Sequence, residues 1–353
     1  METRSNQHSV ATHLPQPPAW KQVATAIVLA VSTFFGAISA AEPQRFSAAE
    51  PHMGVEYEIV LFADNEAAAK DAQRAAFDRI EALNGVLSDY DSTSEAMKLS
   101  ASAPHEQPIA VGADLRTMLG VSCGLYDQSA GAFDITIGPV TKIWRRARRQ
   151  RELPSEAALN AAQESVGGDA IESTADGVRL RKLGMRLDFG GIAKGHAAEE
   201  SLQVLKAKGF KQALVRGSGD IAAGDPPPDA AGWKVAIAPL NPDDKPTEYL
   251  TLANACVSTS GDARQNLVVD GKRYSHIIDP RTGRPVEGRS SVTVVAPHGH
   301  IADGWATALS VLGPAGFERL KKIPGAAAMM VVERDGRTSR HETKNFGPTQ
   351  PVD

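Results

Sequence analysis

The sequence predicts an α+β fold, with mixed sheets and packed helices, on three observations. Several segments repeat apolar residues at three- and four-residue spacing, as amphipathic helices do, while others alternate apolar and polar residues, as strands do. These segments do not follow a regular βαβ order, which argues against a doubly wound parallel sheet. The chain has 353 residues, 42% hydrophobic and 23% charged, enough for one large or two moderate globular domains.

The first 41 residues differ from the rest in composition. Residues 1–22 are polar, whereas residues 23–41 carry no charge and are rich in Ala, Val, Ile and Phe. Ser39-Ala40-Ala41 offers small residues for cleavage before Glu42, so residues 1–41 are predicted to be a secretory signal peptide. The alternative, by length, is a retained anchor that would associate the protein with a membrane. Both predict an exported protein, periplasmic or inner-membrane-associated and facing away from the cytoplasm.

The predicted domain spans residues 42–335 and begins with a strand and a long helix. Residues 56–62 form an apolar run that predicts the first strand, and Asp64 or Asn65 can cap the helix that follows. The polar run 88–95 is predicted to be a loop, and a second helix is predicted near residues 114–126. The apolar stripe of the first helix consists of Phe77, Ile80, Leu83 and Leu87.

The second half of the domain is predicted to be richer in strands. Residues 154–184 read as a surface insertion with a small helix, capped by Ser155, and a short strand pair. Asp270-Gly271 fits a type I′ turn and predicts a hairpin of residues 266–269 and 272–278. The remaining elements are a proline-rich loop at 225–229, strands at 233–238 and 291–296, a helix at 302–312 ended by Gly313, a last strand at 326–333, and a loose polar tail over 336–353.

Charge and cysteine content exclude some classes of function. A net charge of −4 and 5% aromatic residues predict no nucleic-acid partner. Cys123 and Cys256 have no zinc-ligand residues near them in sequence and are predicted to be buried small hydrophobes, although a disulfide between them is the alternative. Five arginines after Trp144 are interpreted as a solvated helix end rather than a partner-docking patch: Arg145, Arg146, Arg148, Arg149 and Arg151.

Residues 185–196, MRLDFGGIAKGH, form a candidate diphosphate-binding segment. Met185 and Leu187 predict a short buried strand, and the paired glycines after Asp188 precede an amphipathic helix. Glycines let the backbone approach a ligand closely, and the N–H groups at a helix start favour an anion. Lys194 adds a positive charge there. The alternative is an ordinary strand–turn–helix with a solvated lysine.

Two further sets of residues could support chemistry. Asp303 and Thr307 lie four apart on one predicted helix, so both oxygens share a face and suit a hard cation such as Mg²⁺. They could equally be a helix N-terminal carboxylate and a hydrogen-bonded hydroxyl. His276 is expected on the second strand of the predicted hairpin, as a general base or as a hydrogen-bonded strand histidine.

Several motifs, in order from Met53 to Gly313, together resemble the ApbE-like flavin transferases, the FAD:protein FMN transferases. An ordered set is more specific than any single member. Its members are Met53-Gly54, residues 88–95 (SDYDSTSE), 131–139 (GAFDITIGP), 185–196, 259–261 (TSG), 274–283 (YSHIIDPRTG), Ala302-Asp303 and Ala306-Thr307.

The resemblance implies an ApbE-like flavin transferase fold with the flavin and a metal in a central cleft. It implies that Asp303, Thr307 and the carbonyl of Gly191 hold Mg²⁺, which the residues do not distinguish from Mn²⁺. It also implies that His276 is the base near the acceptor hydroxyl, with Asp279 in reserve. The residues implied to contact the flavin nucleotide are Met53, Tyr90, Ala132, Phe133, Asp134, Asp188, Lys194, Ser275 and His276.

The implied activity is Mg²⁺-dependent transfer of FMN from FAD to a threonine or serine hydroxyl of an exported target, with release of AMP. The expected target is the FMN-carrier domain of an electron-transfer protein. Hydrolysis of FAD to FMN and AMP, or flavin binding without transfer, are the alternatives. A dehydrogenase is excluded because no Gly-x-Gly-x-x-Gly turn follows an early strand. Three departures from the family pattern affect substrate detail: Val55, Ser218 and Asp262-Ala263.

Overall fold

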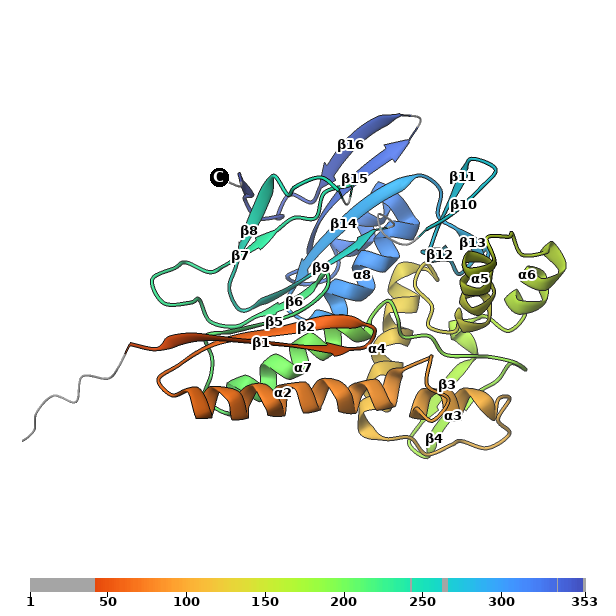
Figure 1. Ribbon diagram of the computed structural model, residues 1–353. Helices are drawn as coiled ribbons and strands as arrows, with labels where there is room; N and C mark the ends of the chain where they lie inside the picture. The colour runs from red at the N-terminus through yellow and green to blue at the C-terminus, as the bar shows by residue number, and fades with distance from the viewer. Residues whose placement is uncertain (1–41, 242, 262–265, 335, 352–353) are drawn as a thin grey trace, which may run out of the picture. The chain divides into compact units, whose positions relative to one another are not determined.

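Strands from both ends of the domain build one large antiparallel sheet. The computed structural model describes residues 42–241, 243–261, 266–334 and 336–351, and the elements below belong to the unit Pro43–Asp353. The sheet has eight strands in the order β1-β2-β5-β6-β9-β14-β15-β16, with every neighbouring pair antiparallel (Figure 1). Their bounds are β1 Gln44–His52, β2 Val55–Ala63, β5 Ala213–Gly217, β6 Asp220–Ala223, β9 Ala255–Gly261, β14 Arg289–Ala296, β15 Ala327–Arg334 and β16 Arg337–Glu342.

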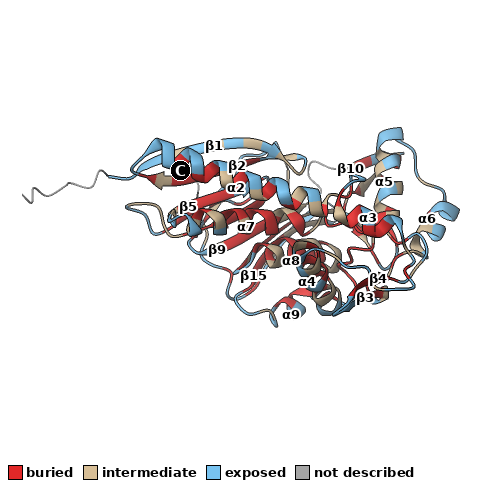
Figure 2. Ribbon diagram, turned by 90° about the horizontal axis from the view of Figure 1, so that it is seen from below, coloured by how far each residue is buried: buried red, intermediate tan, exposed pale blue. Residues whose placement is uncertain are grey.

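Three helices cover one face of this sheet: α2 (Glu66–Leu87), α7 (Ala193–Ala207) and α8 (Gly299–Leu312). Asn65 caps α2 by accepting hydrogen bonds from the backbone N–H groups of Ala67 and Ala68, and the predicted apolar stripe of α2 is buried in the main core. In Figure 2, α7 is buried along most of its length. The predicted α+β class is therefore confirmed, because helices pack on an antiparallel sheet.

A smaller sheet covers the opposite face. Its strands are β7 (Trp233–Ala236), β8 (Glu248–Leu252) and β17 (Gln350–Pro351), in the order β17-β8-β7. Its apolar side chains form a second core with those of the large sheet, among them Trp233 and Leu250 against Val60, Ile221 and Val257. The large sheet is thus the middle of three layers, which explains why its central strands are apolar on both faces.

The remaining elements form a helical region beside the sheet. The helix α5 anchors two small hairpins there, because the Trp144 indole stacks on Tyr274, with ring centroids 5.8 Å apart, and donates a hydrogen bond to the Gly283 carbonyl. The bounds are α3 Glu95–Ala101, α4 Ala113–Ser129, α5 Gly138–Gln150, α6 Glu156–Gln163, β3 Ile171–Thr174, β4 Gly177–Leu180, β10 Asn266–Val269, β11 Lys272–Ser275, β12 Ile278–Asp279, β13 Arg284–Pro285, α9 Phe317–Leu320, and the 3-10 turns η1 Gly168–Ala170 and η2 Gly313–Gly316.

Several predicted elements are confirmed. The helix near 114–126 is α4, Ser155 caps α6, and Gly313 ends α8 with a φ of 64°. Asp270 and Gly271, with φ of 50° and 74°, make the predicted I′-type turn. The strand pair β3/β4 also forms, but Val178 and Leu180 are fully buried in the core, so this segment is not a surface insertion.

Both edge strands of the large sheet were missed. β1 precedes the strand predicted as the first, and β16 follows the one predicted as the last, within the expected loose tail. Their sequences are polar because an edge strand exposes most of its side chains, and backbone pairing to one neighbour holds it in place. The predicted signal peptide lies outside the described residues. Across the described ranges, no helix is both long and apolar enough to span a bilayer.

The first turns of α7 and α8 touch through their backbones. A Cβ atom added at Gly195 would clash with the carbonyl oxygen of Gly299, and one added at Gly299 would clash with the carbonyl of Gly195. Glu199 of α7 reinforces the contact by accepting a hydrogen bond from the Gly299 N–H (2.8 Å) and bonding to the His298 ring (2.8 Å). Burial alone would raise the pKa of Glu199, but the nearby His300 ring and the bonds to His298 and Gly299 lower it to about 2.

We expect Gly195→Ala to lower the free energy of unfolding by about 1–3 kcal/mol, because the added methyl group forces the two helices apart. Gly120→Ala is the matched control, since a Cβ there, in the exposed part of α4, meets nothing within 4 Å. That variant should be stabilised by roughly 0.5–1 kcal/mol because alanine favours a helix. Urea unfolding measures the free energy of unfolding of both variants. An equal change in the two variants would contradict the close contact between the helices.

We expect Glu199→Gln to lower the free energy of unfolding at pH 7 by about 2 kcal/mol. The carboxylate has a depressed pKa, so its contribution is complete above about pH 4.5 and is lost as the pH falls toward 2. The difference from wild type should therefore shrink between pH 5 and pH 3 in urea titrations. The exposed Glu152→Gln is the control, and a difference that does not change with pH would refute the expectation.

Candidate active site

The segment 185–189 is extended and buried, but it is not the predicted strand. Met185 and Leu187 are buried as expected, yet the segment makes only an isolated bridge between Arg186 and Ile137. Its N–H groups bond elsewhere: Leu187 donates to the Ser100 hydroxyl (3.0 Å) and Asp188 to the Ile135 carbonyl (2.7 Å). These bonds tie the segment to α3 and to the loop after α4.

The paired glycines bring the start of α7 against α8. The Thr307 hydroxyl donates to the Gly191 carbonyl (3.3 Å), and a Cβ at Gly191 would lie 3.0 Å from that hydroxyl oxygen and 3.4 Å from the Phe133 ring. Ile192, the residue before α7, makes no side-chain cap bond, and the first turn of the helix carries no acidic residue. The N–H of Gly195 in that turn donates instead to the Asp303 carboxylate of α8 (3.1 Å), so this helix start already holds one negative charge. The positive end of the helix dipole favours negative charge at this point.

Lys194 is not a solvated lysine. Its ammonium group donates to the Gly190 carbonyl (3.1 Å) and lies 3.4 Å from a carboxylate oxygen of Asp220 and 3.5 Å from one of Asp303. Burial alone would lower the pKa of Lys194, but the charges of Asp220 and Asp303 outweigh burial and raise it. Burial and the charge of Asp220 raise the pKa of Asp303 to about 6, against the opposing effect of Lys194.

Asp220 is a site residue that the sequence interpretation missed. It begins β6, directly after the turn Ser218-Gly219, and is buried. The Ser258 hydroxyl donates a hydrogen bond to it from the neighbouring strand β9. An aspartate between apolar strands was the available signal, because a buried carboxylate requires partners.

The residues predicted to hold a metal meet at the α7–α8 contact. Thr307 bonds to Gly191, and Asp303, one turn earlier on α8, accepts a hydrogen bond from the Gly195 N–H (3.1 Å). A carboxylate, a hydroxyl and a carbonyl fit Mg²⁺, which takes oxygen ligands and commonly uses one or two carboxylates with substrate phosphates. Within the described part of the chain, no three His, Cys, Asp or Glu side chains are grouped to hold a metal by themselves.

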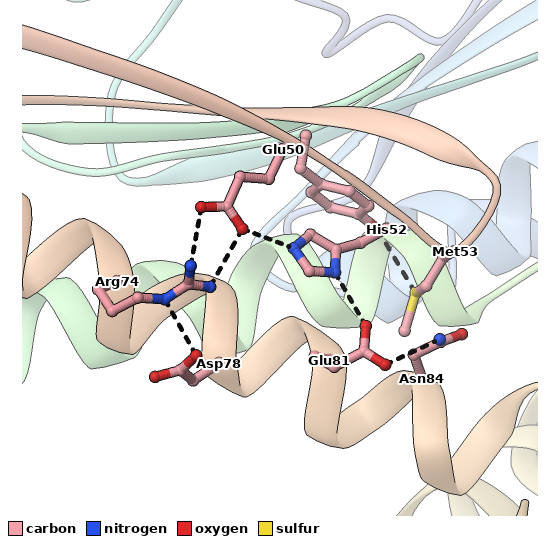
Figure 3. Close-up of polar contacts among 8 residues, drawn as sticks. Glu50, His52, Met53, Arg74, Asp78, Glu81 and Asn84 are labelled. Atoms are coloured by element: carbon pink, nitrogen blue, oxygen red, sulfur yellow. Dashed lines mark hydrogen bonds and ion pairs between the residues drawn. The ribbon is translucent and has the colours of Figure 1, made fainter.

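Met53 lies at the turn of the β1–β2 hairpin, beside the start of α7. Met53 and Gly54 have φ of 48° and 75°, so the two-residue turn is of the I′ type. The Tyr57 hydroxyl donates to the Lys194 carbonyl (3.2 Å) and lies 3.7 Å from the Met53 sulfur, a contact drawn in Figure 3. Tyr57 thereby links the predicted flavin-contacting residue to the predicted diphosphate segment.

Tyr90 is the most accessible of the predicted flavin-contacting residues, with its side chain next to Arg145. It is 79% exposed, and the Arg145 guanidinium carbon lies 4.4 Å from its ring centroid. Arg145 also forms ion pairs with Asp89 and Asp188. The interpretation of Arg145 as part of a solvated helix end was wrong, because three side chains from other elements contact it. Arg146 and Arg149 of the same helix are exposed as expected.

Ala132, Phe133 and Asp134 are all buried in the loop between α4 and α5. The Asp134 carboxylate accepts hydrogen bonds from the Thr136 N–H (2.8 Å), the Thr136 hydroxyl (2.7 Å) and the Gly168 N–H (2.9 Å). Burial raises the pKa of Asp134, and these hydrogen bonds oppose the increase. The protein thus supplies the partners that a buried carboxylate needs, and they hold this loop against η1.

His276 lies in the bend after β11, not on the strand as predicted. The buried Ser275 hydroxyl accepts a hydrogen bond from the Ile277 N–H (3.1 Å), which turns the chain and ends β11. His276 is half-buried there. The reserve candidate Asp279 is held by Arg281, whose guanidinium donates to both carboxylate oxygens at 2.7 and 2.8 Å.

Cys123 and Cys256 are both free thiols, so no disulfide joins them. Burial raises the pKa of Cys123 to about 11 and that of Cys256 to about 12. Both therefore remain protonated at neutral pH. Cys256 is buried as predicted, whereas Cys123 is only partly buried.

Comparison with known proteins identifies similar chains over most of the domain. The profile of the ApbE family matches residues 53–330. The chain is 30% identical over 305 residues to a Vibrio cholerae protein named FAD:protein FMN transferase, covering 84% of this chain and 90% of that protein. It is 31% identical over 313 residues to the Treponema pallidum protein of the same name, covering 82% and 85%.

Two solved structures show the same fold. The apo form of the Pseudomonas stutzeri flavinyl transferase ApbE superposes with a TM-score of 0.76 at 30% identity, covering 86% of this chain and 96% of that one. The flavin transferase ApbE from Vibrio cholerae gives a TM-score of 0.78 at 28% identity, covering 86% and 98%.

We expect Lys194→Met to lower the free energy of unfolding by about 3 kcal/mol, because it leaves Asp220 and Asp303 buried beside each other without a counter-charge. Adding Asp220→Asn to this variant removes one of the two charges and should restore part of the loss. Urea unfolding of the single and double variants tests this. A double variant less stable than the single one would show that Lys194 does not balance these carboxylates.

Proposed function

The chain belongs to the ApbE family, and we propose that it transfers FMN from FAD to a threonine or serine hydroxyl of a target protein and releases AMP. Its relatives from Vibrio cholerae and Treponema pallidum carry the name FAD:protein FMN transferase. The observation that carries the proposal is the junction of α7 and α8. There a glycine turn, the N-terminus of α7, a lysine and a set of oxygen ligands meet. This combination suits a metal-bound diphosphate.

The carboxylate of Asp303, the hydroxyl of Thr307 and the carbonyl of Gly191 would hold Mg²⁺. When bound, the ion neutralises the diphosphate and helps to orient it for in-line displacement. Lys194 adds a second positive charge at the start of α7, where the positive end of the helix dipole also favours the phosphates. The buried position of Asp303 excludes water from one side of this site.

The transfer step exchanges the phosphoanhydride bond of FAD for a phosphoester bond to the target. The acceptor oxygen forms a bond to the FMN phosphorus while the bond from that phosphorus to the bridging oxygen breaks, and AMP leaves. His276 accepts the proton of the acceptor hydroxyl as general base. The exposed ring of Tyr90 and the side chain of Met53 offer an aromatic and an apolar surface to the isoalloxazine.

The target we propose is the FMN-carrier domain of an exported electron-transfer protein. The uncharged, small-residue-rich segment 23–41 supports export, either through a cleaved signal peptide or through a retained anchor at the membrane. An enzyme outside the cytoplasm would flavinylate proteins that meet FAD there.

Intact mass and AMP release distinguish this activity from its two alternatives. The purified protein is incubated with FAD, Mg²⁺ and a candidate FMN-carrier domain. A gain of one FMN on the carrier, lost when Mg²⁺ is chelated, supports the transferase. AMP and free FMN without a mass gain indicate hydrolysis, whereas bound FAD without products indicates flavin binding alone.

We expect Asp303→Asn to reduce metal-dependent turnover by about two orders of magnitude or more, because the variant removes the only charged ligand of the proposed Mg²⁺ site. AMP release over a Mg²⁺ titration is the measurement, and circular dichroism reports whether the fold persists. Asp176→Asn, at an exposed position after β3, is the matched control. Full turnover by Asp303→Asn would overturn the metal assignment.

A further inference from the structure

We propose that Arg145 is a positioning residue for the flavin. It holds the ring of Tyr90 from one face, so that the other face is open for stacking by the isoalloxazine. The inference rests on the proposed function, since it concerns how the same site holds FAD. It adds a residue that neither the motifs nor the predicted site included.

Two buried carboxylates fix the position of the Arg145 guanidinium. One of its amino groups donates to Asp188 (3.0 Å) and the other to Asp89. Both aspartates are only 7% exposed. A planar guanidinium held at two amino groups has a defined orientation, which a lysine ammonium lacks.

The same pair of bonds connects Arg145 to the predicted diphosphate segment. Asp188 also accepts hydrogen bonds from the Thr141 hydroxyl (2.8 Å) and the Gly190 N–H (2.9 Å). Arg145 therefore couples the loop of Tyr90 to the glycine turn before α7. The Tyr90 loop, which would contact the isoalloxazine, and the glycine turn, which would contact the phosphate, therefore share one hydrogen-bond network.

Tyr90 gains a fixed ring position from this network without being buried. The guanidinium carbon lies 4.4 Å from its ring centroid, which is cation–π geometry, while 79% of the residue stays accessible. The Tyr90 N–H also donates to the Ser88 hydroxyl (3.3 Å), which orients the backbone and not the ring. An exposed aromatic ring held from one side is preorganised to stack on a flat ligand.

Electrostatics explain why an arginine occupies this position. Burial and the charge of Asp188 raise the pKa of Asp89, and Arg145 opposes that increase. Without Arg145, only the charge of Arg186 would oppose this increase at Asp89, and one of the two buried carboxylates would tend to take up a proton or turn outward. The loop of Tyr90 would then lose its position together with the ring.

The test is a double-mutant cycle on FAD affinity. Fluorescence titration of FAD in the presence of a chelator gives Kd without turnover for wild type, Arg145→Gln, Tyr90→Leu and the double variant. We expect Arg145→Gln to weaken binding about tenfold and the double variant to bind no more weakly than Tyr90→Leu. Arg146→Gln, exposed on the same helix and bonded only to Gln150 among the described residues, is the control and should bind as wild type.

A second variant keeps the proposal falsifiable if Arg145→Gln does not fold. Arg145→Lys retains the charge between the carboxylates but cannot bridge both and lie flat on the ring. It should melt near the wild-type temperature and still bind FAD several-fold more weakly, with a raised KM for FAD and a smaller change in kcat. Wild-type affinity in Arg145→Lys, or additive effects in the cycle, would overturn the proposal.

The outcomes also separate this inference from the proposed function. If wild type binds FAD but transfers nothing, the transferase proposal fails while the cycle still decides the role of Arg145. If wild type does not bind FAD at all, both proposals are overturned.

Discussion

The backbone contact between α7 and α8 determines the geometry of the site. Gly195 and Gly299 let the two helices approach closely, and Glu199 fastens the start of α8 to the side of α7. The contact sets the distance between the glycine turn before α7 and the two polar side chains on α8. Any side chain larger than a hydrogen atom at Gly195 or Gly299 would separate the two helices. The spacing of the proposed metal ligands therefore depends on these two glycines.

Two cations, each held between two buried aspartates, organise the charges around this contact. Lys194 lies between Asp220 and Asp303, and Arg145 lies between Asp89 and Asp188. Each carboxylate pair would be unstable if left alone in a buried environment, so each cation is needed for the local structure as well as for any ligand.

The sequence was sufficient to predict the elements whose signals are local. The apolar stripe of α2, the Asp270-Gly271 turn and the glycine that ends α8 each depend on neighbouring residues only. Arg145 was missed because its partners come from distant segments, and nothing within the WRRARR run reveals which charge is buried. Asp220 lies between apolar segments, but its partners Lys194 and Ser258 also come from distant parts of the chain. For the same reason, the polar strands β1 and β16 could not be recognised from periodicity, since an edge strand is defined by the strand beside it.

The missed strand β1 explains the unusual conformation of Met53. A methionine with a φ of 48° occupies a turn position that favours asparagine, aspartate or glycine, and such strain persists only where the surroundings impose it. Figure 3 shows those surroundings: His52 is held by Glu81 (2.9 Å) and Glu50 (3.4 Å), and Glu50 is paired with Arg74 of α2.

The polar side chains Glu50 and His52 make β1 hard to recognise as a strand in the sequence. They are also the side chains that fix the turn after it. The Tyr57 hydroxyl joins this turn to α7, because it contacts the Met53 sulfur and donates to the Lys194 carbonyl in the first turn of the helix. Glycine or asparagine would occupy this turn position at lower cost in conformational energy, so a methionine there supports the proposed contact of Met53 with the flavin.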